Sequence, residues 1–188
     1  MRTVTYGAAC SLDGFIAGVD GSIDWLHFSK DVQQVMTTYW KGVDAVLMGR
    51  KTWALAAPQS QAKGAKRRSK DPAKEAAKPK GPATFVFSRT LEGVVAPGVE
   101  LVSSDAGEFV RRMKAKPGGG ICVMGGGELA CALFAADVID EVGINVHPIL
   151  LGAGIPLFRD AGRRIPLDLL ESRIIEGGCV LSTYRVRR

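Results

Sequence analysis

The sequence predicts an α/β fold, in which helices cover both faces of a mostly parallel sheet and an antiparallel hairpin closes one side. Three observations support this prediction. Short apolar runs with strand patterning alternate with amphipathic helical patterns along most of the chain. Two of those runs pass directly into glycine and then into a helix start, as the strands of α/β units do. Near the end, two β-patterned stretches are joined at Glu176-Gly177-Gly178, which is a hairpin signal.

The individual elements follow from the same patterns. We expect strands at residues 4–10, 43–48, 83–87, 99–102, 121–124 and 142–146, and hairpin strands at about 169–175 and 179–186. We expect helices at residues 31–41, from about Thr52, at 105–114 and at 128–136. The first helix has its apolar residues at i, i+3, i+4 and i+7 spacing, with Ser29 as a cap and Asp31 in the first turn.

Length and composition narrow the class of protein. The 188 residues predict one domain, spanning residues 1–188, that is long enough to bury a core. No apolar run approaches the roughly 18 residues that span a bilayer, and the first residues enter a strand pattern directly, so we expect a cytoplasmic protein without a membrane partner. The four cysteines form no CxxC pair and are expected to be buried thiols. With only two histidines, neither a metal site nor a Ser-His-Asp triad is expected.

The net charge of +6 originates in one segment, an insertion at about 58–82. This segment holds eight Lys and Arg residues against two acidic ones, whereas the rest of the chain is balanced. Its composition, without aromatic or branched aliphatic residues, predicts a flexible surface loop. Contact with an anionic partner such as nucleic acid is the alternative, but it is disfavoured because no aromatic side chain is available for base stacking.

Two strand–glycine–helix junctions carry the functional signal. The first is Gly49-Arg50-Lys51-Thr52, directly after the apolar run that ends at Met48. The second is Gly125-Gly126-Gly127, followed by Glu128 and Leu129. Backbone N–H groups at a helix start bind phosphate, so two such junctions predict a dinucleotide cofactor. Each junction alone is weak evidence, because tight turns need glycine even without a ligand. A Rossmann domain is disfavoured, since the glycine run comes two-thirds along the chain.

Taken together, the motifs resemble a known superfamily. Ala8-Ala9, Asp13, Ile16-Ala17, Trp25, the Gly49 junction, Phe87-Ser88-Arg89 and the triple glycine occur in the order seen in dihydrofolate reductases. The closer resemblance is to the reductase domain of bacterial riboflavin biosynthesis and its stand-alone relatives, through Ser11-Leu12-Asp13-Gly14, Asp140-Glu141-Val142 and the segment 148–158. It covers nearly the whole chain apart from the basic insertion. The resemblance implies a dihydrofolate-reductase-like fold of three layers.

The resemblance also implies NADPH as cofactor, lying across the carboxyl ends of the strands. Gly49, Arg50, Lys51 and Thr52 would then hold the pyrophosphate or adenosine phosphate, and Ser88 with Arg89 would meet the 2′-phosphate. Gly125, Gly126 and Gly127 would let the backbone approach the cofactor, with Glu128 and Leu129 starting the helix. The nicotinamide would be bordered by small or apolar residues, which could equally be ordinary core: Ala9, Ile16 and Ala17.

A proton donor for the reduction is optional. By resemblance Asp31 is the best candidate, although an acid in the first turn of a helix also complements the helix dipole without any catalytic role. Asp13 is a second candidate, but Asp-Gly is above all a turn signal. His27 is expected near the mouth of the cleft. Gly152-Ala153-Gly154 would either cradle a substrate phosphate or only turn the chain.

These expectations combine into one function and two alternatives. The expected function is NADPH-dependent reduction of a small heterocycle, either the ribosylaminopyrimidine of the riboflavin pathway or a pterin such as dihydrofolate. The alternatives are a non-catalytic nucleotide-sensing module and nucleic-acid contact through the basic loop. We also expect a homodimer, because part of one apolar set could exceed what one core absorbs. This set consists of Ile144, Val146, Ile149 to Leu151 and the alternating apolar residues of the C-terminal hairpin beside them.

Overall fold

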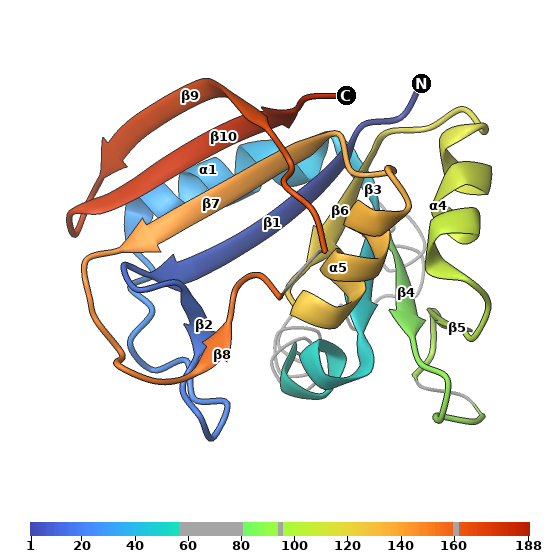
Figure 1. Cartoon of the computed structure of the whole chain (residues 1–188), viewed down its shortest axis with the longest axis horizontal. Coiled ribbons are helices and arrows are strands. Elements are labelled where there is room, and N and C mark those ends of the chain that lie inside the picture. Colours follow the sequence, from blue (N-terminus) through green and yellow to red (C-terminus); the bar gives the residue numbers. More distant parts are fainter. Residues whose placement is uncertain (57–80, 94–95, 160–161) are drawn as a thin grey trace, which may run out of the picture.

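The computed structural model describes residues 1–56, 81–93, 96–159 and 162–188, and most of the basic insertion at 58–82 therefore lies outside the described residues. Its centre is a sheet of eight strands in the order β5-β4-β3-β6-β1-β7-β10-β9 (Figure 1). The bounds are Val4–Ser11 for β1, Val43–Gly49 for β3, Ala83–Phe87 for β4, Val99–Val102 for β5, Gly120–Met124 for β6, Glu141–His147 for β7, Leu167–Ile175 for β9 and Cys179–Val186 for β10.

Six of these strands are parallel and two are antiparallel. The strands β5, β4, β3, β6, β1 and β7 run parallel to their neighbours, so their carboxyl ends meet at one edge of the sheet. Strand β10 pairs antiparallel with β7, and β9 pairs antiparallel with β10. The predicted mostly parallel sheet with a terminal hairpin is confirmed.

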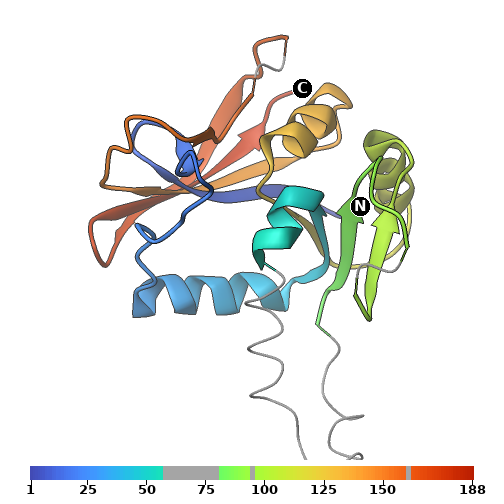
Figure 2. The same cartoon turned by 90° about the horizontal axis from the view of Figure 1, so that it is seen from below.

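Helices lie on both faces of the sheet, as predicted. Helix α1 (Lys30–Lys41) covers one face, and α4 (Ala106–Lys114) and α5 (Gly127–Ala135) lie on the opposite side (Figure 2). The core between them contains Tyr6, Leu47, Ile121 and Leu133, all fully buried. Three layers, helix, sheet and helix, give the architecture that the sequence predicts.

The helix starts differ by a few residues from expectation, and the caps explain why. Ser29 does cap α1, because its side chain accepts a hydrogen bond from the Val32 N–H. The next helix begins at Arg50, directly after β3 and two residues before the expected start at about Thr52. Asp105 is the cap of α4 and accepts from the Glu108 N–H, so this helix begins at Ala106. Helix α5 starts at Gly127 behind the left-handed Gly126.

Helix α1 buries less than its pattern suggests. None of its residues is fully buried, and Met36 is 40% exposed. Trp40 packs against the small cluster of Val46, Met48 and Val86. Val32, Val35 and Tyr39 are half-buried, so the exposed apolar surface of this helix is at Met36.

A second, two-stranded sheet was not expected from the sequence. Strand β2 (Phe15–Ala17) pairs antiparallel with β8 (Ile155–Pro156), nearly the whole chain away. The two segments are also joined by a hydrogen bond from the Leu157 N–H to the Gly14 carbonyl at 2.8 Å. Together they form a flap beside the carboxyl end of β1 (Figure 1).

Candidate functional site

The carboxyl ends of four neighbouring strands place the predicted residues in one row. In the pairing of β3 with β6, Met48 lies opposite Met124, so Gly49 and Gly125 follow side by side. In the pairing of β3 with β4, Gly49 lies opposite Phe87, and Ser88 comes next. On the other side, Gly7 of β1 lies opposite Met124. Three strand spacings separate β4 from β1, about 14 Å in all, a span comparable to an extended dinucleotide.

The two glycine junctions touch each other through Thr52. Gly125 and Gly126 have φ angles of 51° and 72°, which favour glycine. A Cβ on Gly125 would lie 3.1 Å from the Thr52 methyl carbon, and one on Gly126 would lie 3.1 Å from the Thr52 hydroxyl. Any side chain at either glycine would therefore fill the space between the helix at 50–56 and the start of α5.

The start of α5 has no side-chain cap. Its cap residue is Gly126, which offers no side-chain hydrogen bond to the first-turn N–H groups. Such N–H groups and the helix dipole favour negative charge at this end. Gly127 is closely packed, because a Cβ there would lie 3.3 Å from Arg159 Cγ and 3.4 Å from the Pro156 carbonyl oxygen.

Three cations lie at the end of the row that the resemblance assigns to the adenosine. Arg50, Lys51 and Arg89 are all exposed. The Ser88 hydroxyl oxygen accepts hydrogen bonds from the Thr90 N–H at 3.2 Å and the Leu91 N–H at 3.0 Å. These two hydrogen bonds stabilise the turn that carries Arg89. The hydroxyl group of Ser88 can still donate a hydrogen bond to a ligand.

The residues predicted near the nicotinamide lie at the other end. Ala9 and Ile16 are half-buried, while Ala17 is buried on β2.

In the first turn of α5, Leu129 is buried in the core, and Glu128 is exposed with its carboxylate 3.4 Å from Arg159. Leu129 therefore contributes packing at the helix start, and Glu128 contributes surface charge.

Both candidate carboxylates accept backbone hydrogen bonds. The exposed Asp31 accepts from the Glu176 N–H, at the tip of the β9–β10 hairpin, at 3.2 Å. Asp13 accepts from the Ser11 hydroxyl at 2.6 Å and from the N–H groups of Leu151 and Gly152 at 3.2 and 2.8 Å. The Ser11 hydrogen bond, followed by those of the backbone, lowers the pKa of Asp13. Asp13 thus anchors the turn at Gly152, which supports its reading as a turn residue.

Sequence reasoning missed a buried polar group at the end of β7. His147 is 3% exposed, and its Nδ1 lies 3.4 Å from the His27 backbone nitrogen and 3.4 Å from Cys179 Sγ. Its Nε2 lies 3.2 Å from the amide nitrogen of Asn145, which pairs with Ala9 across the strands. Burial, with a smaller effect of His27, lowers the pKa of His147. A polar residue at the carboxyl end of an apolar strand was the signal available.

Two unpartnered polar atoms surround this histidine. The indole ring of Trp25 meets the His147 ring edge-on with centroids 5.5 Å apart. Trp25 Nε1 and Asn145 Oδ1 are buried and have no hydrogen-bond partner among the described residues. Buried polar atoms without a partner destabilise the fold unless a water or a ligand forms a hydrogen bond with them. Trp25 and Asn145, which pairs with Ala9, are therefore suited to polar contacts with a ligand.

The match to a protein family classifies the chain that carries this row of strand ends. The model of the RibD C-terminal domain matches residues 2–181. The chain belongs to the RibD C-terminal domain family. A similar sequence is the uncharacterized protein YyaP of Bacillus subtilis (strain 168), which is 30% identical over 187 residues, 97% of this chain and 94% of that protein.

Solved structures agree with this membership. A putative riboflavin biosynthesis protein from Shewanella sp. PV-4 superposes with a TM-score of 0.79 at 26% identity, and the match covers 100% of both chains. The dihydrofolate reductase of Enterococcus faecalis, solved with NADP(H), superposes with a TM-score of 0.65 at 16% identity over 99% of this chain and 97% of that one. The dihydrofolate-reductase-like fold is therefore confirmed.

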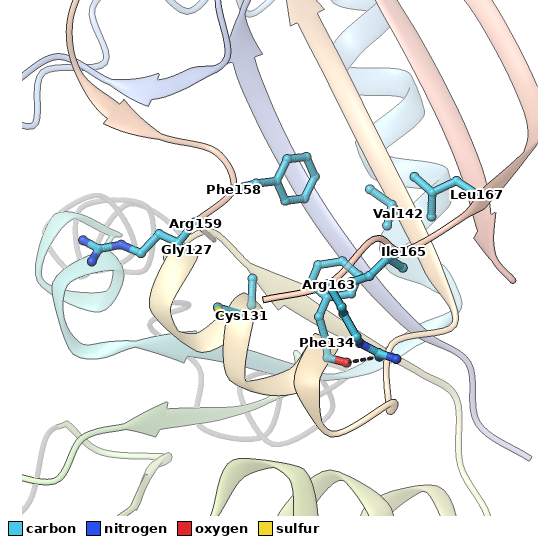
Figure 3. A pocket seen from close by; sticks show the side chains of 10 residues that line it. Gly127, Cys131, Phe134, Val142, Phe158, Arg159, Arg163, Ile165 and Leu167 are labelled. Carbon is cyan, nitrogen blue, oxygen red and sulfur yellow. Dashed lines mark hydrogen bonds between the residues drawn. The ribbon is translucent and has the colours of Figure 1, made fainter. Parts of the chain in front are cut away.

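This RibD C-terminal domain has a further cavity of about 200 Å³ on the flank of α5 (Figure 3). Phe134 and Cys131 of α5 form one wall, and Phe158 and Ile165 form the other. The Arg163 guanidinium donates to the Phe134 carbonyl at 2.9 Å. Apart from Gly127, the cavity shares no residue with the row of strand ends, so it is separate from the candidate site.

Two classes of site receive no support from the described part of the chain. Within it, no cluster of three or more His, Cys, Asp or Glu side chains could hold a metal ion. Within the same residues, no helix has the length and apolar character needed to cross a membrane.

Proposed function

We propose that this chain is an NADPH-dependent reductase of a small heterocyclic substrate of the riboflavin-pathway type, such as 5-amino-6-(5-phosphoribosylamino)uracil. The observation that carries the proposal is the contact of Gly125 and Gly126 with Thr52, because it joins two phosphate-binding junctions into one row of strand ends. Family membership and the similarity to a putative riboflavin biosynthesis protein of Shewanella support the substrate class.

The residues fit a dinucleotide phosphate at this edge. The two left-handed glycines leave a cradle that any Cβ would fill, and the uncapped start of α5 offers N–H donors. Arg50, Lys51 and Arg89 supply positive charge at the far end of the row. The dihydrofolate reductase with a similar fold was solved with NADP(H), which supports the choice of cofactor.

Each group of residues has a separate task in the proposed reduction. When bound, the nicotinamide supplies the hydride, so no nucleophilic side chain is needed. Ala9 and Ile16 provide small apolar walls that exclude water from the reacting carbon. Arg89 and the Ser88 hydroxyl proton bind the 2′-phosphate, which NADH lacks.

We propose Asp31 as the proton donor to the substrate. The Glu176 N–H at the hairpin tip donates a hydrogen bond to its carboxylate at 3.2 Å, so the orientation of this side chain depends on the position of the hairpin tip. Asp31→Asn is expected to lower kcat about tenfold or more while leaving the KM for NADPH unchanged. An Asp31→Asn variant with the kcat of the parent would contradict the role of proton donor and leave Asp31 only its contact with the hairpin.

Cofactor preference tests the proposal most directly. Arg89→Ala should weaken NADPH binding by about tenfold or more, because a charge-assisted hydrogen bond is lost, and should leave NADH binding unchanged. Arg112→Ala on α4 is the matched control, since this exposed arginine lies on another element and pairs only weakly with Glu108 at 3.6 Å. Titration calorimetry measures both cofactors. Equal affinity of the parent protein for NADPH and NADH would contradict the assignment.

Turnover is tested separately from binding. We expect NADPH oxidation when the ribosylaminopyrimidine phosphate is added, and little when dihydrofolate is added. Tight NADPH binding without oxidation by either compound would favour the nucleotide-sensing alternative.

A further inference from the structure

Arg159, which follows β8, lies against the start of α5. The Cβ that Gly127 lacks would meet Arg159 Cγ at 3.3 Å, so the aliphatic part of this side chain passes the first residue of the helix. Its guanidinium lies 3.4 Å from the carboxylate of Glu128, the second residue of the helix. The side chain points away from the apolar cavity (Figure 3). The charge of Arg159 therefore lies at the amino end of α5.

The two residues before Arg159 anchor its backbone to the flap and the core. The Leu157 N–H donates to the Gly14 carbonyl at 2.8 Å, and the Leu157 carbonyl accepts from the Tyr6 hydroxyl at 3.0 Å. The ring of Phe158 packs against that of Tyr6, with centroids 5.7 Å apart. The Arg159 side chain itself is half-exposed, so its guanidinium is accessible to a ligand.

The amino end of a helix is an unfavourable place for a cation, because this end carries a partial positive charge. Arg163, four residues further on, has the favourable arrangement, since it donates to the Phe134 carbonyl at the carboxyl end of α5 at 2.9 Å. The ion pair of Arg159 with Glu128 offsets little, because the two side chains are 50% and 69% exposed. A role in stability therefore does not account for Arg159.

An anion at the start of α5 does account for it. The first-turn N–H groups behind Gly126 have no side-chain cap, so an anion bound to them would lie beside the guanidinium of Arg159. The strand order β4-β3-β6-β1 places this helix start between the proposed adenosine end at β4 and the proposed nicotinamide end at β1. The anionic group in the middle of a dinucleotide is its pyrophosphate.

We infer that Arg159 binds the pyrophosphate of the cofactor and exchanges its contact with Glu128 for phosphate oxygens. This inference rests on the proposed function. The pyrophosphate is common to NADPH and NADH, whereas the 2′-phosphate assigned to Arg89 is present only in NADPH. Arg159 thus sets the affinity for both dinucleotides, and Arg89 sets the preference between them. Glu128 competes with the cofactor for the guanidinium.

Titration calorimetry with both cofactors separates these roles. Arg159→Ala should raise the dissociation constants of NADPH and NADH by the same factor, about tenfold or more, because a charge-assisted contact to a shared group is lost. Arg159→Lys keeps the charge without the planar fork and should give intermediate values. Glu128→Gln should lower both dissociation constants, because the competing carboxylate is removed.

Arg163→Ala is the matched control, since it removes an exposed arginine from the same segment at the other end of α5 and should leave both affinities unchanged. Unfolding midpoints establish that each variant is folded. Parent affinity in Arg159→Ala, or a loss confined to NADPH, overturns the inference and leaves the proposed function in place. Unchanged affinity in Glu128→Gln also overturns it. A parent chain that binds neither cofactor would contradict the proposed function and this inference together.

Discussion

Gly126 combines two separate demands on a single residue, a left-handed backbone and the absence of a side chain. Gly21 has a similar φ of 86°, but a Cβ there would meet nothing within 4 Å. Gly21→Ala should therefore cost about 1 kcal/mol from backbone strain alone. Gly126→Ala should cost about 2 kcal/mol or more, since its Cβ also meets the Thr52 hydroxyl at 3.1 Å. Urea unfolding measures both. Equal losses would show that the contact with Thr52 has no energetic weight.

His147 predicts a pH dependence of stability. Burial lowers its pKa in the folded chain below the ordinary value of about 6.5. As the pH falls through that value, the unfolded chain binds a proton that the folded chain does not, so the free energy of unfolding should decrease below about pH 6.5. Above it, His147 contributes no slope.

The control for this prediction is the second histidine. His147→Gln should remove the decrease between about pH 6.5 and 5. His27→Gln should preserve most of it, because burial is the larger cause of the lowered pKa of His147 and the exposed His27 is the smaller one. Cys179, whose pKa is raised by burial, stays neutral throughout this range. A flat stability profile in the parent protein would contradict the role assigned to His147.

At the scale of elements, one ion pair ties α4 to the strands beneath it. Lys114 is 6% exposed, and its Nζ lies 2.6 Å from Asp140 Oδ2 and 3.2 Å from the Val138 carbonyl oxygen. Asp140 also accepts the Val4 N–H at 2.9 Å. Burial raises the pKa of Asp140, but the hydrogen bonds from Lys114, Val4 and Arg188 outweigh it, and the net direction is downward.

Removing the lysine should leave this carboxylate partly unpaired. Lys114→Met is expected to destabilise the fold by about 2–3 kcal/mol, less than for a completely isolated charge because Arg188 and Val4 remain bonded to Asp140. Lys116→Met, an exposed position just beyond the same helix, should change stability by less than about 0.5 kcal/mol. Guanidinium unfolding of both variants measures the difference. Similar values for the two would show that the pair is energetically neutral.

The elements that could be predicted were those with local signals. Ser29 and the periodic apolar residues after it predicted α1, and Gly177-Gly178 predicted the hairpin, because each signal lies within a few residues of the element it marks. The small sheet of β2 and β8 could not be predicted. It has three residues in one strand and two in the other, and they come from opposite ends of the chain.

The same distinction applies to the candidate site. The glycine junctions were recognisable because strand, glycine and helix start are consecutive in the sequence. The hydrogen bond from Glu176 to Asp31 and the surroundings of His147 were not, since each joins segments more than 100 residues apart. Sequence patterns therefore predicted the edge at which we propose that phosphate binds, whereas the buried polar groups of Trp25, Asn145 and His147 were found only in the tertiary structure.

For the molecule as a whole, the central position of β1 in the sheet has the widest effect on folding. This first strand lies in the middle of the sheet, with β6 on one side and β7 on the other. Tyr6 and Val4 are fully buried there, and the Tyr6 hydroxyl donates to the Leu157 carbonyl at 3.0 Å. Both neighbours of β1 in the main sheet thus lie more than 100 residues further along the chain.

The central place of β1 bears on how the protein is made. During translation the first strand leaves the ribosome long before Ile121 and Val142 exist, so its apolar side chains have nothing to pair with for most of synthesis. Contacts between such distant segments also slow the folding reaction. Nascent chains arrested before β7 should therefore be sensitive to protease and bound by chaperones. Arrest after residue 186, when the hairpin has also emerged, should give protease resistance.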